Sequence, residues 1–412
     1  DNVKLVNPEY VIDTDRLDFY TVSGYAFLYG PTTITSDTSI IYCERGFYNT
    51  NNDTGYFVKK SRIDYDERTI IGDSLYFDRN KNFASATNNI KVTDTLNNSI
   101  IKGHYAEVFR AKDSVFITKR ALAITKQEND SIFIHSDTLM ITGPPDQRIV
   151  RAFYNAKMYK SDLSGKADSI HMNQNTGLTQ LINFYDTDSE DTFSKRRHPV
   201  LWHHENQITG DSIHLISNPK TESLDSLKVF ENAFVISKDS LGAGYNQISG
   251  KKLDGLFKEN ELHTIDVIKN AESIYFLRNA DNELVGIDKS KSGKMRIWVS
   301  ENKIDELRKI NQIDGKTYPE DDFPENERIL KGFVWRETER PRSVEDLFSE
   351  DPPLELPVIK GLGVHSPQAA FFDKSLENRV EAAGKPSKKS KEKLLNNKAG
   401  RKIPKNISKA EK

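Results

Sequence analysis

Serine residues in a repeated phrase are the first candidates for chemistry in this sequence. Gly-Asp-Ser occurs at residues 72–74 and 210–212 and could supply a nucleophile. No glycine follows Ser74 or Ser212 at the spacing of a Gly-x-Ser-x-Gly nucleophile turn. A catalytic serine is also single, whereas this phrase recurs. Because Asp and Ser side chains bond nearby backbone amides in turns, we interpret the phrase as a turn signal.

Two adjacent histidines suggest a metal site. Trp202 is followed by His203, His204 and Glu205. Adjacent residues on a strand point to opposite faces, so the two imidazoles are not expected to share a ligand, and no His-Glu-x-x-His helix is present. The single cysteine, Cys43, rules out a cysteine-rich zinc site and an internal disulfide. We therefore expect neither a metal nor any other cofactor.

Acidic residues could serve as glycosidase carboxylates or calcium ligands. The acidic run at 186–191 lacks the glycine and the terminal glutamate of a calcium-binding loop, so we interpret it as a solvated loop. Other acids, at positions 37, 73, 107, 137, 168 and 211, recur at intervals of 30 to 43 residues. A polysaccharide-active β-helix needs two carboxylates that converge once in a groove. We predict that the chain is not an enzyme and expect no catalytic residues.

The elements that carry these residues are short strands. Apolar and polar residues alternate in runs such as 74–78, 89–93 and 211–215, and turn residues separate the runs. The phrase that carries the recurring acids, such as Gly-Asp-Ser, alternates along the chain with a second phrase. In the second phrase an asparagine precedes Ile or Ala, at Asn89, Asn155, Asn232 and Asn270. Two alternating phrases predict strand-turn-strand repeats that bury their apolar faces by stacking. We predict an all-β repeat region over residues 1–299.

The rest of the chain has a different composition. Ser300, Gly315 and an apolar stripe at 304, 307, 310 and 313 predict a helix over 300–315. Residues 316–384 are acidic and rich in proline, and we expect a mostly extended arm with a capped turn at 343–346. Residues 385–412 hold 11 Lys or Arg and 2 acids, a charge of +9, and are expected to be a disordered basic tail.

Charge and hydropathy narrow the class of protein. The net charge is -2, so the remainder of the chain carries -11, and only 36% of residues are hydrophobic. This composition favours a thin-walled β structure over one compact globule. The tail lacks aromatic residues for stacking on bases, so we expect no nucleic acid partner. No apolar run could span a bilayer, and because the first residues already alternate like a strand, we expect a processed or truncated start.

The interior of the stacked repeats is the candidate binding region. Its predicted lining consists of apolar residues that alternate with polar neighbours. They are Leu75, Phe77, Ile90, Val92, Val115, Ile117, Ile132, Ile134, Ile170, Met172, Ile213 and Leu215. If the repeats close tightly, this interior is only a core, as in a structural surface repeat protein. If they splay open, it is a trough for acyl chains. The sequence leaves both readings open.

The order of the repeat phrases resembles the OstA-like family, the LptA-type periplasmic proteins of lipopolysaccharide transport, in a Bacteroidetes-like form. The resemblance covers about residues 1–290 and is carried by the segments 7–17, 29–34, 43–50 and 71–78. No single motif is specific; their order and number carry the likeness. The length, the arm and the basic tail depart from the small bridge proteins of the family.

The resemblance implies an elongated open β-jellyroll whose apolar groove holds the acyl chains of lipid A. It also implies a location in the periplasm, with a possible association with the outer membrane. Implied partners are lipopolysaccharide or a related lipid, and LptC-type and LptD-type jellyrolls that dock end to end by strand addition. The lipid cargo, the oligomeric state, and whether the chain is a free bridge or part of a larger translocon are left open.

Overall fold

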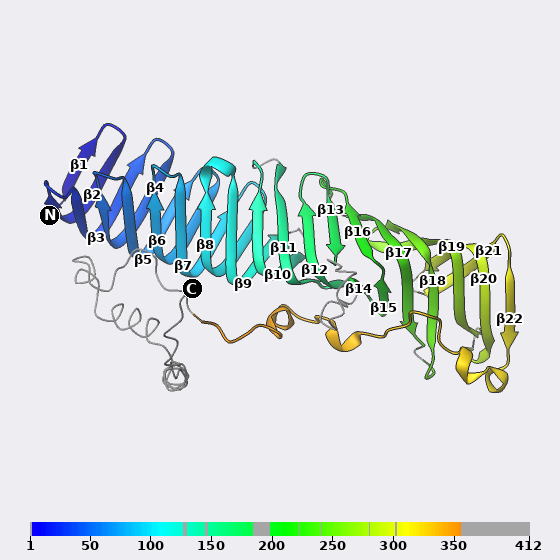
Figure 1. The fold of residues 1–412 in the computed structure, drawn as a ribbon. Helices are drawn as coiled ribbons and strands as arrows, with labels where there is room; N and C mark the ends of the chain where they lie inside the picture. The colour runs from blue at the N-terminus through cyan, green and yellow to red at the C-terminus, as the bar shows by residue number, and fades with distance from the viewer. Residues whose placement is uncertain are drawn as a thin grey trace, which may run out of the picture. The chain divides into compact units, whose positions relative to one another are not determined.

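Antiparallel strands make up most of the chain in the computed structural model, which describes residues 2–126, 130–144, 147–183, 198–221, 223–239, 241–279, 281–300 and 303–355. Residues 1–354 form one compact unit, and Glu355 is the only described residue of a second unit, 355–412. The first unit is a long stack of consecutive strands (Figure 1). The predicted all-β, elongated jellyroll-like fold is confirmed.

The strands of the first half of the stack are β1 (Val3–Asn7), β2 (Tyr10–Tyr20), β3 (Tyr25–Ser36), β4 (Ser39–Asn49), β5 (Thr54–Tyr65), β6 (Arg68–Asp78), β7 (Phe83–Asp94), β8 (Ser99–Phe109), β9 (Ser114–Lys126), β10 (Ser131–Thr142) and β11 (Ile149–Lys160). Those of the second half are β12 (Leu163–Asn173), β13 (Leu178–Ile182), β14 (Val200–His203), β15 (Asn206–Thr209), β16 (Ser212–Ser217), β17 (Leu224–Lys238), β18 (Tyr245–Lys258), β19 (Glu261–Arg278), β20 (Leu284–Ser300), β21 (Lys303–Ile310) and β22 (Asp314–Tyr318). The 3-10 turn η1 (Arg110–Lys112) lies between β8 and β9.

Each long strand bends once, and the bends form a row of corners along the stack. At every corner the pairing register shifts, for example between Ile71 and Ser74 in β6 and between Thr87 and Ile90 in β7. The corners divide the sheet into two half-sheets. The first half-sheet contains, among others, segments 10–14, 32–36, 61–65, 90–94, 131–136, 156–160, 200–203, 206–209, 233–238, 245–250 and 271–278. The second contains 16–20, 25–29, 45–49, 54–58, 74–78, 105–109, 138–142, 224–230, 252–258 and 261–268.

The two repeated phrases of the sequence meet at the corners. Asn89, Asn155, Asn232 and Asn270 all have left-handed backbone conformations, with φ between 49° and 52°, which asparagine tolerates better than most residues. Three of these amides donate to the acid of the other phrase: Asn89 to Asp73 at 2.8 Å, Asn155 to Asp137 at 3.0 Å, and Asn232 to Asp211 at 2.9 Å. The recurring acids at these three positions thus accept hydrogen bonds that fix the corners.

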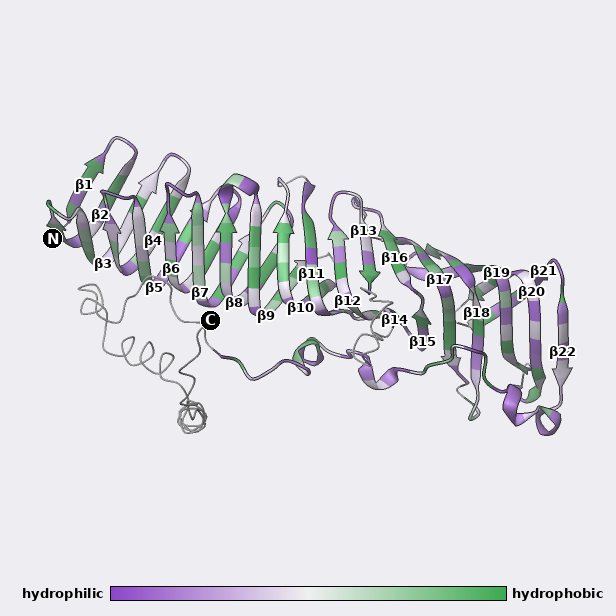
Figure 2. Cartoon of the chain, viewed as in Figure 1, coloured by the Kyte–Doolittle hydropathy of each residue, from purple (hydrophilic) through white to green (hydrophobic). Residues whose placement is uncertain are grey.

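The core lies between the half-sheets. One continuous cluster of buried apolar side chains extends from Tyr10 to Ile297 and takes residues from both half-sheets. Apolar and polar residues alternate along the strands, as Figure 2 shows by colour. Among the described residues, no helix has the length and apolarity needed to cross a membrane.

The helix expected over 300–315 is wrong, because the strand stack continues there as β21 and β22. Residues Ile304 and Leu307 both pack against the core cluster, although residues three apart on a regular strand face opposite ways. A register shift lets Val299 pair with Ile304 while Trp298 pairs with Glu306. This bulge imitates the three-residue spacing of a helix. The expected boundary of the repeat region at 299 moves accordingly to Tyr318.

The arm that follows β22 is docked on the stack. Residues 319–354 contain only the short turns η3 (Glu320–Asp322), η4 (Glu325–Glu327), η5 (Glu337–Glu339) and η6 (Glu345–Phe348). The arm runs back along the outer face of the first half-sheet, yellow to orange in Figure 1, and reaches β10. The capped turn at 343–346 is confirmed, since Ser343 N–H donates to Asp346 and Asp346 N–H donates to the Ser343 hydroxyl. The expectations for 356–384 and 385–412 lie outside the described residues.

Two buried glutamines hold the arm. Gln247 donates to the Arg328 carbonyl at 2.8 Å and accepts from Leu330 N–H at 2.9 Å. Gln207 likewise donates to the Val334 carbonyl at 2.7 Å and accepts from Arg336 N–H at 2.6 Å. Each amide therefore supplies the pair of bonds that a neighbouring strand would give. A second apolar cluster forms beneath the arm, from Phe234, Ile236, Ile274, Ile287, Phe323 and Leu330.

Candidate functional site: a trough between two half-sheets

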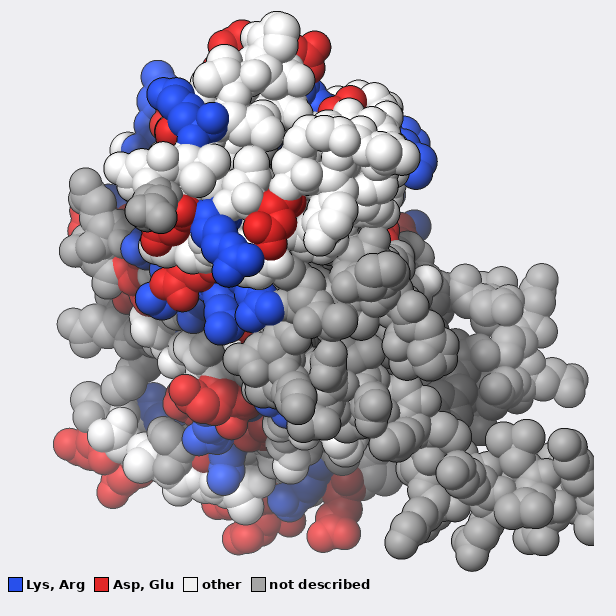
Figure 3. Space-filling model, turned by 90° about the vertical axis from the view of Figure 1, so that its left-hand side faces the viewer, with Lys and Arg blue, Asp and Glu red and all other residues white. Residues whose placement is uncertain are grey.

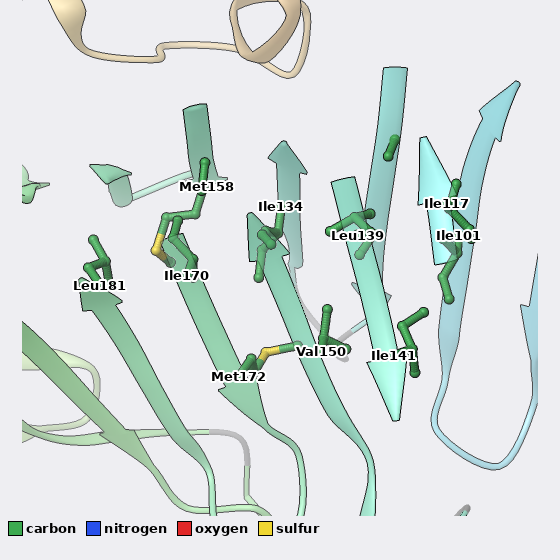
Figure 4. Packing of buried hydrophobic residues seen from close by; sticks show 14 of the residues in the cluster. Ile101, Ile117, Ile134, Leu139, Ile141, Val150, Met158, Ile170, Met172 and Leu181 are labelled. Atoms are coloured by element: carbon green, nitrogen blue, oxygen red, sulfur yellow. The ribbon is translucent and has the colours of Figure 1, made fainter. Parts of the chain in front are cut away.

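The predicted lining residues lie inside the stack. Leu75, Ile90, Val92, Val115, Ile117, Ile134, Ile170, Met172, Ile213 and Leu215 are buried members of the core cluster. Phe77 and Ile132 are half-buried and pack against it. Figure 4 shows the middle of this interior, where Ile134, Val150 and Met172 come from the successive strands β10, β11 and β12. The structure thus brings all twelve into one continuous apolar interior between the half-sheets.

The interior opens near the N-terminal end, on the side opposite the corners. We call this side the mouth; there the hairpin turns of the two half-sheets face each other. A cavity of about 190 Å³ lies at the mouth between β2 and β8. Its apolar lining includes Tyr10, Ile34, Ile41, Tyr48, Ile63, Ile70, Phe77, Ala84 and Val108. Only Phe77 of these was named from the sequence, although the others obey the same alternation.

Aromatic rings span this part of the trough. Tyr10 of the first half-sheet meets Tyr48 of the second, with ring centroids 5.2 Å apart. Tyr48 also stacks on Phe77 at 5.9 Å, and Phe77 stacks on Phe57 at 5.7 Å. Burial raises the pKa of Tyr48, whose hydroxyl donates to Asp53. The phenol therefore stays neutral, and the surface offered to a ligand here is apolar and uncharged.

Arginines lie at the mouth of this cavity. Arg79 reaches across from the second half-sheet to Glu9 at 2.7 Å, and Arg110 lies over the ring of Tyr65, 4.6 Å from its centroid. Both arginines are exposed. The exposed Arg79–Glu9 ion pair contributes little stability, so this contact can part without a large cost. The N-terminal trough thus combines an apolar floor with a charged rim that holds Arg79, Arg110 and Asp78, and its two exposed arginines suit an anionic amphiphile.

Further along, a buried arginine closes the mouth. Arg148 is 3% exposed and lies between the half-sheets, with its Nε 3.9 Å from Asp94. Asp94 also accepts from Arg68 Nε at 3.3 Å. The cavity that these residues line is only about 30 Å³, roughly the space of one water molecule. The open trough therefore ends at this point, and nothing in the spacing of Arg148 indicated this role.

The histidine pair closes the mouth nearer the C-terminal end. His203 ends β14 and His204 stands in the following turn with a left-handed backbone, φ 48°. The turn interrupts strand alternation, so the rings lie together, with centroids 4.3 Å apart. The argument that the two imidazoles must point apart is therefore wrong. Burial, and then His204, lower the pKa of His203 to about 4, so its imidazole is neutral at neutral pH.

A carboxylate from the opposite half-sheet joins the histidines. Glu261 begins β19, and its Oε2 lies 3.5 Å from His204 Nε2. Ligand atoms of His203, His204 and Glu261 lie within 4.8 Å of one another. Within the described ranges, this is the one group of three such residues that could hold a metal ion. The acidic run at 186–191 lies outside the described residues.

Comparisons with known proteins give little beyond this geometry. No protein-family model matches the chain, and no curated protein matches it. One similar solved structure is that of LptH from Pseudomonas aeruginosa, described as the LptA homologous periplasmic component of a conserved lipopolysaccharide transport device. The identity is 16% and the TM-score 0.28, over 32% of this chain and 92% of that chain. A likeness of this size carries no argument about function.

Proposed function

We propose that the chain is a non-catalytic lipid-binding scaffold that holds the acyl chains of an anionic amphiphile in its N-terminal trough. The observation that carries the proposal is the open cavity of about 190 Å³, with its apolar lining and its rim of Arg79 and Arg110. Each buried acyl methylene contributes about 0.8 kcal/mol, while an arginine rim suits phosphate head groups. Following the family resemblance of the sequence, we propose lipopolysaccharide as the cargo and the periplasm as the location.

The test uses Phe77, which lines the cavity and is half-buried. A glutamate here is expected to fold, because water reaches the mouth, and to abolish lipid capture, because acyl chains avoid a carboxylate. The matched control is Ile71→Glu, on the same strand but outside the cavity and 39% exposed. A photo-crosslinker at position 77 should capture lipopolysaccharide, whereas one at position 71 should not.

Two results would contradict the proposal. One is equal capture of lipid by the Phe77→Glu protein and the wild type. The other is equal crosslinking from positions 71 and 77. Parallel capture of phosphatidylglycerol and lipopolysaccharide distinguishes a general acyl-chain site from one that prefers lipid A.

A purely structural role is the second candidate, and the closed middle of the stack favours it. Arg148 blocks the mouth at 3% exposure, and the side chains beyond it are packed as one core. Under this alternative the N-terminal cavity is only the frayed end of a core. A Phe77→Glu protein that fails to fold would support this reading, because a dry core does not accept an unpaired carboxylate.

The end of the stack that carries β1 and β2 is proposed as the docking edge for another jellyroll. In the described chain, residues 16–20 of β2 pair with β3 alone, and Phe19, Tyr20 and Val22 are 43%, 56% and 96% exposed. Figure 3 looks at this end, where uncharged atoms make up most of the upper part. The edge strand β21 at the other end carries Asp305, Glu306, Arg308 and Lys309, and charge of this kind discourages strand addition.

Docking by strand addition predicts that Phe19→Pro weakens assembly, because proline cannot donate to a new ladder. Cysteine crosslinking of the chain to a jellyroll partner, or to a second copy, would detect the loss. Unchanged crosslinking would exclude this edge as the docking site.

A further inference from the structure

The histidine pair lies at the mouth in the C-terminal half of the stack. His203 and His204 lie at the turn of the β14–β15 hairpin, in the first half-sheet. Glu261 lies just after the β18–β19 turn, in the second half-sheet. The ring of Phe257, also from the second half-sheet, lies 5.5 Å from that of His203. The three side chains therefore meet across the gap between the half-sheets, at a place the proposed lipid cavity does not include.

Several buried polar atoms at this place make no hydrogen bond in the described structure. His203 is 2% exposed, yet neither of its ring nitrogens has a hydrogen bond in the described structure. His204 Nε2 and Asp162 Oδ1 are also buried without a hydrogen bond, although His204 Nε2 lies 3.5 Å from Glu261 and Asp162 Oδ1 lies 3.7 Å from Lys160 Nζ. Buried polar groups in folded proteins are almost always satisfied, by protein groups, by water or by a bound ion. Each neutral imidazole offers one ring nitrogen with a lone pair, which is what a cation requires.

We propose that His203, His204 and Glu261 bind a divalent transition metal ion of the zinc class, which clips the two edges of the trough together. Two imidazoles and a carboxylate suit zinc or cobalt better than the hard cations Mg²⁺ and Ca²⁺. In a tetrahedral site with bonds of about 2.0–2.1 Å, neighbouring ligand atoms lie about 3.3 Å apart. The His204 to Glu261 separation of 3.5 Å is close to that distance, and small rotations of exposed Glu261 bring the set together.

A water molecule would complete the coordination, and Asp162 positions the turn that carries His204. Asp162 stands in the turn between β11 and β12, and its backbone carbonyl accepts from His204 N–H at 3.2 Å. The nearby ring of Phe257 supplies an apolar shell that limits access of water. Because two ligands come from one half-sheet and one from the other, the ion would hold this part of the mouth shut whether or not lipid occupies the N-terminal trough.

The test measures metal binding by the full chain after treatment with a chelator. Zinc should bind with one equivalent per chain by equilibrium dialysis, and cobalt should give the visible absorption of a tetrahedral site. His204→Ala and Glu261→Gln change side chains that are not fully buried, so both variants should fold. Each should weaken zinc binding by about 10–100-fold or more. His214→Ala and Glu272→Gln, which lie outside the cluster, are the matched controls and should bind as the wild type does.

Hydrogen exchange tests the clip. Added zinc should slow exchange in the turns at 203–206 and 258–261, and not in the Glu261→Gln protein. The metal site is wrong if the chelated wild type takes up neither zinc nor cobalt at micromolar concentration, or if His204→Ala and Glu261→Gln bind as tightly as the wild type. The clip is wrong if zinc binds and exchange in both turns stays the same.

Discussion

Replacing the glutamines that hold the arm should release it while the strand stack stays folded. Gln207→Met and Gln247→Met keep the length of each side chain and remove both of its polar groups. Gln247 and Gln207 are 1% and 0% exposed, so water cannot replace their bonds while the arm is docked. Each change leaves one carbonyl and one N–H of the arm without a hydrogen bond. For Gln247 these are the Arg328 carbonyl and the Leu330 N–H.

The size of the effect follows from these two orphaned groups. A buried unsatisfied group costs about 1–3 kcal/mol, so each variant should weaken docking by about 2–6 kcal/mol. The apolar contacts of Phe323 and Leu330 remain. The amides of the arm should then exchange through local opening of the arm and no longer through global unfolding of the stack. Even 2 kcal/mol corresponds to roughly 30-fold faster amide exchange. The double variant should add less than the sum, because both glutamines hold one segment.

Hydrogen exchange with peptide resolution is the assay. Peptides within 323–336 should lose protection, while peptides from β3 to β9 keep theirs. The control is Gln180→Met, since Gln180 bonds to His214 on the second half-sheet at 3.2 Å and does not contact the arm. Unchanged protection of 323–336 in the double variant would refute the reasoning, and so would an equal loss of protection along the whole stack.

Two further outcomes follow from buried and paired groups. Burial raises the pKa of Cys43 to about 12, so its thiolate population is about three orders of magnitude below that of an ordinary thiol; a disulfide reagent should label it only after unfolding, and prompt labelling at pH 8 would contradict its burial. Burial raises the pKa of Glu350, but Lys166 at 2.8 Å outweighs it and the net pKa is lowered. Its stabilisation of the docked arm is thus full above the ordinary glutamate pKa of about 4.3 and is lost as the pH falls below it. The rate of proteolysis or amide exchange at 343–354 should rise in acid. In Glu350→Gln this rate should depend less on pH, although His135 and Asp351 remain in place. The same acid profile in both proteins would exclude Glu350 as the cause.

Alternation along the chain was enough to predict the strands and the interior. Leu75, Ile134 and Ile213 fall inside because side chains on a strand alternate between faces. The asparagine phrase could be located but not explained from the sequence, since the partner of Asn155 at the corner, Asp137, becomes its neighbour only when two strands bend together. The pattern of residues along the sequence therefore predicts the repeats, whereas the corner of each strand forms only when neighbouring repeats stack.

Features that depend on breaks in the pattern could not be predicted. The bulge between Trp298 and Ile304 gave β21 the spacing of a helix. The left-handed turn at His204 reversed the expected direction of its ring. Arg148 and Gln247 act through partners far away in sequence, and nothing in their neighbourhoods indicates those partners. Each case rests on one backbone conformation or one distant contact, which composition and periodicity do not encode.

The docked arm changes the order in which the stack should come apart. Stacked repeats normally fray from either end, because each repeat is held only by its neighbours. Here the arm leaves the last strand and returns to β10, where His135 meets Asp351 across 216 residues of sequence. Fraying from β22 must peel this strap away, while fraying from β1 breaks only nearest-neighbour contacts. Under mechanical load or rising temperature, the end that carries the lipid cavity should therefore yield first, and β10 to β22 should give way together as one unit.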